Sequence, residues 1–309
     1  KIYATCFDNE ADTRRMRDAA ANEIATRYPA SSERHALQVQ LRRSLGRRQV
    51  ALDCAGKALR LDLAAETHPV SPENQALFSA ISLPAPFPAR IELATDVGCG
   101  CGVFGLSALR TAANNGTVID EMIFSDPHQP SLAALARTLT RHAADLPMLA
   151  RATLSDASLL DALHSRRIRA GLICANLPQT PAPSGFRLDR WGGADGADLI
   201  CRFLDELPQV LAVDGVAFLL HIGLAHPARV AATMVRNRFD AVVLAEQTRH
   251  ARFADYEAMQ PGLADHLRAE CAAGRAQWET DADGTGFRFQ VRLLRLSLLT
   301  QSDTARRPA

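Results

Sequence analysis

Asp96-Val97-Gly98-Cys99-Gly100-Cys101-Gly102 joins an apolar run at 91–97 to a helix-forming segment that begins after residue 102. Glycines at this spacing permit a tight turn and a close approach of backbone to a ligand, and the N-terminus of the following helix favours an acceptor group. A strand, a glycine turn and a helix in this order predict the first βα unit of an open α/β sheet.

The chain beyond this loop alternates between apolar runs and helical segments. The helices are predicted at 131–144, 199–211 and 228–238, and they separate strands predicted at 91–97, 122–125, 149–154, 170–175, 216–222, 242–247 and 287–296. Strands that alternate with helices indicate βαβ units. We therefore expect an α/β fold with a doubly wound, mainly parallel, seven-stranded sheet.

The chain before residue 89 has a different pattern. Residues 5–47 read as helical, the short alternating runs at 49–54 and 59–63 flank Gly56 as in a hairpin, and 83–88 is a proline-rich linker. We expect a helical and hairpin region over 1–88, the main domain over 89–300, and a polar, disordered tail over 301–309.

Charge and cysteine content restrict the class of protein. The formal net charge of +1 gives no bulk electrostatic reason to expect nucleic acid or an anionic membrane as partner. No apolar run approaches the ~18 residues of a membrane span. The 7 cysteines are odd in number and scattered, which predicts a reducing cytoplasm. Cys99 and Cys101 lack a second Cys/His pair at ligand spacing, so we expect no metal site.

The glycine loop fits two kinds of cofactor site. Gly100-x-Gly102-x-x-Gly105 matches the dinucleotide fingerprint of dehydrogenases. Asp96 favours a different ligand, because a carboxylate two residues before Gly98 can pair with the ammonium of a methionine moiety but would repel a pyrophosphate. A methyltransferase using S-adenosylmethionine (SAM) is the better fit, and a nicotinamide-dependent oxidoreductase is the remote alternative.

Two more carboxylates follow strands. Asp126 comes after the second strand and could accept hydrogen bonds from ribose hydroxyls in either interpretation. Asp156 follows the third strand, where it could meet an adenine amino group. The residues predicted to bind the cofactor are Asp96, Gly98, Cys99, Gly100, Gly102, Asp126, Asp156 and Asn176.

The fourth strand ends abruptly in Asn176-Leu177-Pro178-Gln179. Ligands of open α/β sheets bind beyond the carboxyl ends of the strands. We therefore predict that Asn176 and Gln179 face the methyl acceptor as the catalytic pair.

Taken together, these motifs resemble those of class I methyltransferases, which implies their Rossmann-like fold and SAM as cofactor. The loop at Asp96 resembles their SAM-binding motif, and the Asn176 turn resembles their Asn-Pro-Pro-Tyr-type motif. Two further stretches resemble the peptide-release-factor glutamine methyltransferases: Asp189-Arg-Trp-Gly-Gly-Ala-Asp-Gly-Ala-Asp198 and the proline-rich Val70-Ser-Pro-Glu-Asn74. The resemblance covers roughly residues 48–250.

The acceptor motif departs from that of the glutamine enzymes. Leu177 replaces a proline, and Gln179 replaces an aromatic residue whose ring, in that family, packs on the acceptor amide. A Leu-Pro-Gln version resembles the module of methionine S-methyltransferases. The resemblance thus implies S-methylation of L-methionine as the leading function, with N5-methylation of a protein glutamine, such as one in a release factor, as the alternative.

The acceptor is expected to be a small molecule. An amino acid offers an ammonium to a carboxylate and a carboxylate to an arginine. The segment 252–280 has no counterpart in the glutamine enzymes and is expected to be a helical insertion that could cover a small substrate. The candidates for acceptor recognition are Glu73, Pro178, Arg187, Arg190, Trp191 and Tyr256.

Overall fold

The computed structural model describes residues 49–54, 57–63, 77–184, 191–257 and 259–299. The helical segment expected at 5–47 and the tail at 301–309 lie outside these residues. Three of the predicted acceptor-binding residues, Glu73, Arg187 and Arg190, also lie outside them.

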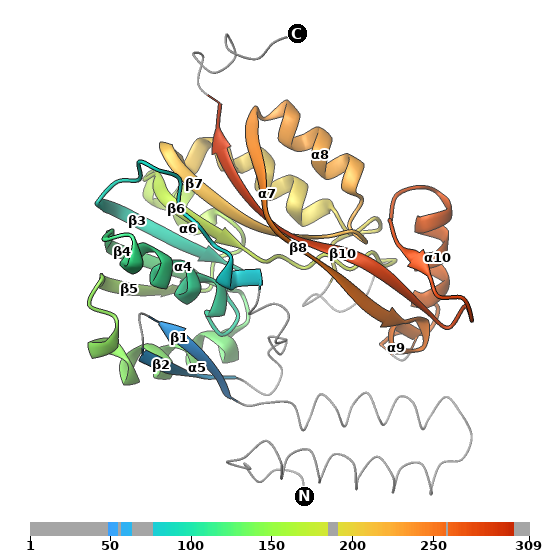
Figure 1. Ribbon diagram of the computed structural model, residues 1–309, viewed down its shortest axis with the longest axis horizontal. Coiled ribbons are helices and arrows are strands. Elements are labelled where there is room, and N and C mark those ends of the chain that lie inside the picture. Colours follow the sequence, from blue (N-terminus) through green and yellow to red (C-terminus); the bar gives the residue numbers. More distant parts are fainter. Residues whose placement is uncertain (1–48, 55–56, 64–76, 185–190, 258, 300–309) are drawn as a thin grey trace, which may run out of the picture.

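The central sheet has the strand order β5-β4-β3-β6-β7-β10-β8 (Figure 1). The first five strands of this order pair in parallel, and β10 runs antiparallel to both of its neighbours. A short β9 (Glu279–Thr280) pairs with β10 off this path. The predicted doubly wound, mainly parallel sheet is confirmed, and β9 adds an eighth strand to the seven that were predicted. The seven strands are β3 (Arg90–Val97), β4 (Val118–Ser125), β5 (Leu149–Ser155), β6 (Ala170–Ala175), β7 (Leu211–Ile222), β8 (Phe239–Arg252) and β10 (Gly286–Leu298).

The strand order reverses direction between β3 and β6. β3 pairs with β4 on one side and with β6 on the other, and Val97 lies opposite Ala175 at the carboxyl ends. The loops that leave β3 and β6 therefore start side by side, at the switch point where ligands bind in sheets of this kind.

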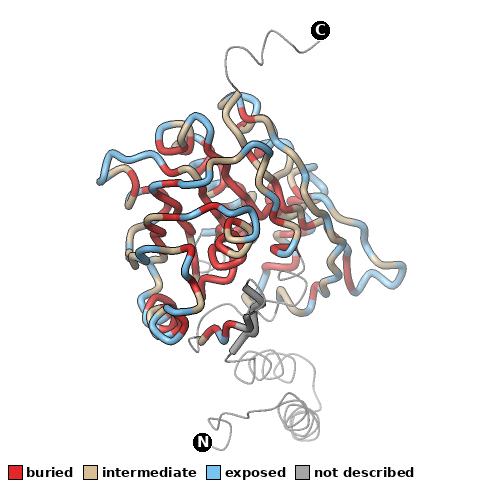
Figure 2. The backbone as a smooth tube through the Cα atoms, turned by 60° about the vertical axis from the view of Figure 1, so that its left-hand side comes forward, coloured by how far each residue is buried: buried red, intermediate tan, exposed pale blue. Residues whose placement is uncertain are grey.

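Helices cover both faces of the sheet (Figure 1). One core cluster contains Phe104, Leu135 and Phe218. The other contains Leu163 and Phe203, which belong to the helices on the opposite face. Figure 2 shows the buried residues gathered in the interior of the molecule. β6 is apolar along its whole length because both of its faces are covered. The helices are α4 (Val103–Asn114) and α5 (Gln129–Arg141) on one face, and α6 (Asp161–Arg166), α7 (Asp198–Val210) and α8 (Pro227–Arg236) on the other.

The predicted hairpin forms from β1 (Gln49–Cys54) and β2 (Lys57–Asp62) as a separate two-stranded sheet. It docks on α5: the Arg60 N–H donates to Nε2 of His142 at 3.1 Å, and the Asp62 N–H donates to Oγ1 of Thr138 at 3.0 Å. Leu59 and Leu61 are fully buried in the core that α4 and α5 share. The hairpin is thus held by backbone hydrogen bonds and by apolar packing.

β8 and β10 form a long antiparallel pair that extends past the rest of the sheet (Figure 1). β8 is much longer than the run predicted at 242–247, because residues 248–252 pair with β10 although they lack an apolar alternation. The insertion between the two strands carries α9 (Phe253–Glu257) and α10 (Leu263–Ala272). Only part of the segment expected to be helical at 252–280 is therefore helix. Within the described ranges, no helix is long and apolar enough to cross a membrane.

Candidate functional site

The glycine turn after β3 depends on backbone conformations that favour glycine. Gly98 has φ of +65° and Gly102 has φ of +82°, in the left-handed region. Gly102 also precedes α4 directly, and a Cβ atom there would lie 2.6 Å from Leu135. The turn therefore brings the N-terminus of α4 close to the carboxyl end of β3.

Asp96 is a buried carboxylate, and only one of its two oxygens is hydrogen-bonded among the described residues. It is 1% exposed, and its Oδ2 accepts a hydrogen bond from the Gly105 N–H at 2.8 Å. Its Oδ1 is buried and has no hydrogen-bond partner among the described residues. Burial raises the pKa of Asp96 to about 7; the Gly105 N–H opposes this shift and nearby Asp126 adds to it. A cationic donor beside Oδ1 would satisfy this atom and stabilise the ionised form.

Asp126 ties the glycine turn to the end of β4. Its Oδ2 accepts from the Gly100 N–H and its Oδ1 from the His128 N–H, each at 2.8 Å. The Cys99 N–H donates to the Ser125 carbonyl at 3.0 Å. Asp126 thus holds the loop, and it remains half-buried. Its predicted role toward a ribose stays a prediction.

Asp156 lies one strand further along the same edge. The Asp126 N–H donates to the Ser155 carbonyl at 3.0 Å, so the ends of β4 and β5 are adjacent. Asp156 is exposed and accepts a hydrogen bond from the Gln129 side chain at 3.0 Å. Carboxylates from three successive strands, β3, β4 and β5, therefore follow one edge of the sheet.

Three cysteines lie near the buried carboxylate as neutral side chains. Cys99, Cys101 and Cys174 are all buried. Burial raises the pKa of each thiol, to about 12 for Cys101. They remain protonated at neutral pH, so they pack around the loop and contribute no charge to it.

Asn176 lies beside the glycine turn with its amide free to bind. A Cβ atom added to Gly98 would lie 3.6 Å from the Asn176 carbonyl oxygen. Asn176 is half-buried, and within the described part of the chain its side-chain amide forms no hydrogen bond. The two loops at the switch point are therefore in contact, and Asn176 offers a donor and an acceptor there.

Gln179 was predicted to face the acceptor, and the structure bonds its side chain to the end of β7. Gln179 is 5% exposed, its Nε2 donates to the Leu220 carbonyl at 2.8 Å, and its Oε1 accepts from the Ile222 N–H at 2.9 Å. Both ends of the carboxamide are bonded to the end of β7. Gln179 therefore anchors the loop that carries Asn176.

Trp191 and Tyr256, both predicted to recognise the acceptor, meet in one small apolar cluster. With Met259 they pack on Ala182 and Leu263, and the Trp191 indole N–H donates to the Ala182 carbonyl at 2.9 Å. Both rings are half-buried, as is Pro178. Their contact with an acceptor stays a prediction.

Two polar residues that the sequence analysis did not single out converge near these loops. Arg229 of α8 is paired with Asp195 and Asp198, and His266 of α10 donates to the Ala194 carbonyl at 2.7 Å. Neither has a sequence signal, because each is one polar residue on an amphipathic helix.

Comparison with known proteins gives matches at the level of structure alone. The chain matches no family model and no curated protein. Among similar solved structures is the precorrin-6y C5,15-methyltransferase of Geobacter metallireducens, at 12% identity and a TM-score of 0.43, over 77% of this chain and 93% of that one.

Two others act on macromolecules. The Mtq2–Trm112 complex of E. cuniculi, responsible for methylation of the eRF1 translation termination factor, matches at 14% identity and a TM-score of 0.39, over 75% of this chain and 98% of that one. The 16S rRNA N2 G1207 methyltransferase of T. thermophilus, in complex with AdoMet and guanosine, matches at 16% identity and a TM-score of 0.44. The match covers 82% of this chain and 50% of that one. At these identities and TM-scores, the activity of this chain has to be argued from its own residues.

Proposed function

We propose that the chain is a SAM-dependent methyltransferase that acts on a small molecule, with the thioether of L-methionine as the leading acceptor. The observation that carries the proposal is the buried Asp96 carboxylate, whose Oδ1 has no hydrogen-bond partner among the described residues, at the edge where the glycine turn contacts Asn176. A ligand with an ammonium group would supply the missing donor.

Each of the three carboxylates along the edge would take one polar group of SAM. Asp96 would hold the ammonium, Asp126 the ribose hydroxyls and Asp156 the adenine amino group. SAM, when bound, supplies an activated methyl group. A nicotinamide dinucleotide fits less well, because its pyrophosphate would lie against a carboxylate that burial has deprived of solvent screening.

Asn176 would orient the acceptor. Gln179 and β7 hold the backbone around it, and its amide has no hydrogen-bond partner in the described part of the chain. In methyl transfer the protein mainly aligns the reacting groups and excludes water, and alignment of this kind contributes roughly 7–11 kcal/mol. A thioether has no proton to lose, so Asn176 needs no general base beside it, whereas an amide nitrogen would.

The insertion favours a small acceptor. Leu263 at the start of α10 packs on Ala182, and His266 bonds to the Ala194 carbonyl, so α10 rests on the chain that follows Asn176. A protein substrate would have to approach past this covering. Glutamine methylation on a protein, and methylation of RNA, therefore rank below a small acceptor.

Isothermal titration tests the proposal. The chain is titrated with S-adenosylhomocysteine, and the complex is then titrated separately with L-methionine, a glutamine-containing peptide and a short RNA. Binding of S-adenosylhomocysteine followed by binding of L-methionine, with S-methylmethionine formed from SAM, is the expected result. No binding of S-adenosylhomocysteine would overturn the methyltransferase proposal, and turnover of the peptide or the RNA alone would overturn the small acceptor.

A further inference from the structure

Residues 191–197, which we name the clamp loop, lie against the loop that carries Asn176. The Gly192 N–H donates to the Thr180 carbonyl and the Ala182 N–H to the Gly193 carbonyl, each at 3.1 Å. Thr180 and Trp191 also form an isolated parallel bridge. The clamp loop and the acceptor loop (176–182) are therefore joined backbone to backbone.

Two glycines let these loops approach without intervening side chains. A Cβ atom on Gly192 would lie 2.8 Å from Cα of Gln179, and one on Gly196 would lie 2.6 Å from the Gln179 carbonyl oxygen. Gly196 would also meet Pro181 at 3.0 Å. A displacement of the clamp loop by a fraction of an ångström is thus transmitted to the backbone at Gln179, three residues from Asn176.

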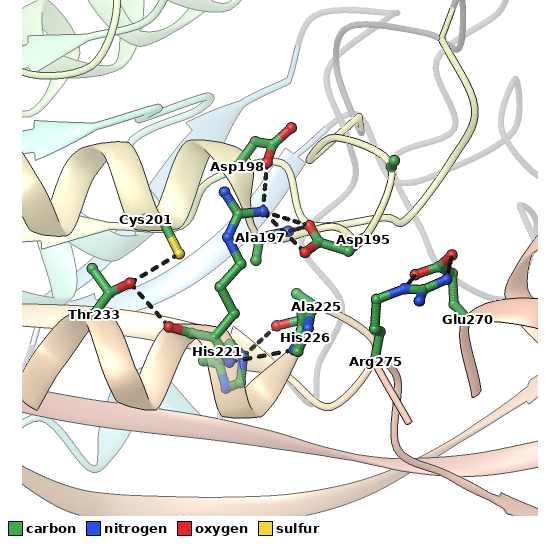
Figure 3. Close-up of polar contacts among 12 residues, drawn as sticks. Asp195, Ala197, Asp198, Cys201, His221, Ala225, His226, Thr233, Glu270 and Arg275 are labelled. Atoms are coloured by element: carbon green, nitrogen blue, oxygen red, sulfur yellow. Dashed lines mark hydrogen bonds and ion pairs between the residues drawn. The ribbon is translucent and has the colours of Figure 1, made fainter. Parts of the chain in front are cut away.

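A single nitrogen atom fixes the clamp loop to α8. Nη1 of Arg229 contacts both carboxylate oxygens of Asp195 at 2.9 Å and Oδ1 of Asp198 at 2.6 Å. Figure 3 shows Asp195 and Asp198, with dashed lines for the contacts that these aspartates make. Burial alone would raise the pKa of Asp195, but the Ala197 N–H and Arg229 outweigh it, so the pKa lies below its usual range. The carboxylate is ionised, and the loop is held by charge.

We propose that Arg229 is a positioning residue for the acceptor site, acting through the clamp loop on Asn176. This rests on the proposed function, since it assigns Asn176 to the acceptor. The insertion sits on the same loop, because His266 bonds to the Ala194 carbonyl. Both walls of the acceptor site, the acceptor loop and α10, therefore depend on the anchor that Arg229 provides.

This ion pair differs from an ordinary surface pair in its setting. Arg229 is 42% exposed at its side chain, but Asp195 is only 14% exposed and its Oδ1 also accepts from the Ala197 N–H. Because the Arg229 side of the pair is exposed, solvent screens the interaction and its contribution to global stability is small. The expected consequence of losing Arg229 is therefore local: the clamp loop and acceptor loop loosen while the sheet stays folded.

The test compares Arg229→Met, which keeps most of the apolar stem of the side chain but removes its charge, with Arg229→Lys. Because one nitrogen makes all three contacts, an ammonium can replace it in part. The matched control is Arg236→Met on the same helix. Arg236 pairs with Asp205 at 2.6 Å, and neither residue belongs to the clamp loop. Amide hydrogen exchange is measured for peptides covering 176–183 and 191–198, together with S-adenosylhomocysteine affinity and turnover of L-methionine.

Arg229→Met is expected to speed exchange in both peptides by about tenfold, which corresponds to about 1.4 kcal/mol of opening free energy. Arg229→Lys should recover part of this change, and Arg236→Met should show none of it. In Arg229→Met, S-adenosylhomocysteine affinity should stay within about twofold of the parent, while kcat for L-methionine falls by about tenfold. Arg229→Lys should recover part of this kcat.

Faster exchange confined to 191–198 would overturn the proposal, as would an equal effect of Arg236→Met. Failure of the parent chain to bind S-adenosylhomocysteine would instead overturn the proposed function. The exchange measurement needs no cofactor or acceptor, so it decides the coupling between the two loops in either case.

Discussion

The proposed cofactor edge, formed by Asp96, Asp126 and the glycine turn, and the proposed acceptor side around Asn176 are built in different ways. At the cofactor edge, the bonds that shape the glycine turn join residues close in the chain: Asp96 and Gly105 are 9 apart, and Gly100 and Asp126 are 26 apart. On the acceptor side, Gln179 reaches β7 across 41 residues, and His266 reaches Ala194 across 72. The first half is a local motif, and the second is assembled by tertiary contacts.

The difference suggests that the two halves can be perturbed separately. The cofactor edge depends on one strand–turn–helix unit and its neighbouring strand ends. The acceptor side depends on α8, α10 and the end of β7, none of which contributes a polar contact to Asp96 among those described. A change in one half should therefore leave binding in the other largely intact.

The largest effect is expected from Asp96→Asn. The amide keeps the acceptor for the Gly105 N–H but removes the charge that would pair with the cofactor's ammonium. Because losing one partner of a buried ion pair costs roughly 3–5 kcal/mol, affinity for S-adenosylhomocysteine should fall by roughly 100-fold or more. Calorimetry measures this affinity. The control is Asp120→Asn, because Asp120 of β4 pairs with the exposed side chain of Arg90. An affinity equal to the parent's would show that Asp96 does not hold the ligand.

Gln179→Leu should affect the acceptor side alone. The leucine leaves the Leu220 carbonyl and the Ile222 N–H without the partners that Gln179 provides, and each buried, unpaired group costs about 1–3 kcal/mol. We expect a lower free energy of unfolding in urea and a loss of methyl transfer, with S-adenosylhomocysteine affinity within about twofold. Gln277→Leu, at an exposed site, is the control. A parallel loss of cofactor affinity would mean that the two halves are not separable.

The pH dependence of cofactor binding should follow Asp96. The raised pKa of about 7 means that the carboxyl is protonated in acid and must ionise to pair with an ammonium. S-adenosylhomocysteine affinity should therefore fall about tenfold for each pH unit below 7 and level off above it. Calorimetry from pH 5.5 to 8.5 measures this, and in Asp96→Asn the dependence should disappear.

The same carboxyl affects stability in the opposite direction when no ligand is bound. The pKa of this carboxyl is about 4 in the unfolded chain, below its value in the folded chain. Its contribution to the free energy of unfolding is therefore fully present below a pH of about 4 and is lost as the pH rises to about 7. The parent should lose more stability than Asp96→Asn over this interval in urea unfolding. Equal pH profiles for the two chains would indicate that Asp96 is ionised in the free protein.

The smallest effect is expected from His266→Ala. One hydrogen bond from α10 to the clamp loop is lost, which is worth about 1 kcal/mol. The KM for the acceptor should rise about fivefold and hydrogen exchange in α10 should quicken, with cofactor affinity unchanged. His250→Ala is the control, because His250 pairs with Asp281 on the β8–β10 extension. If both variants behave alike, α10 has no specific role at the site.

The alternation of strands and helices and the glycine turn were readable from the sequence because short-range physics produces them. Side-chain periodicity reports which faces are buried, and only glycine adopts the φ angles of the turn at little cost. The strand at 170–175 was predicted at its observed limits, since both of its faces are covered and its residues are uniformly apolar. Asp96 was identified for the same reason, as part of one contiguous motif.

The tertiary structure decided what the polar residues around Asn176 do. The sequence placed Gln179 toward a ligand, but the end of β7 lies beside it and offers a carbonyl and an N–H that satisfy its amide. Arg229 and His266 were indistinguishable from solvated residues until α8 and α10 packed against the clamp loop. The physical reason is that a polar side chain takes whichever partner lies within reach, and residues far apart in the chain come within reach only when the sheet and helices have packed.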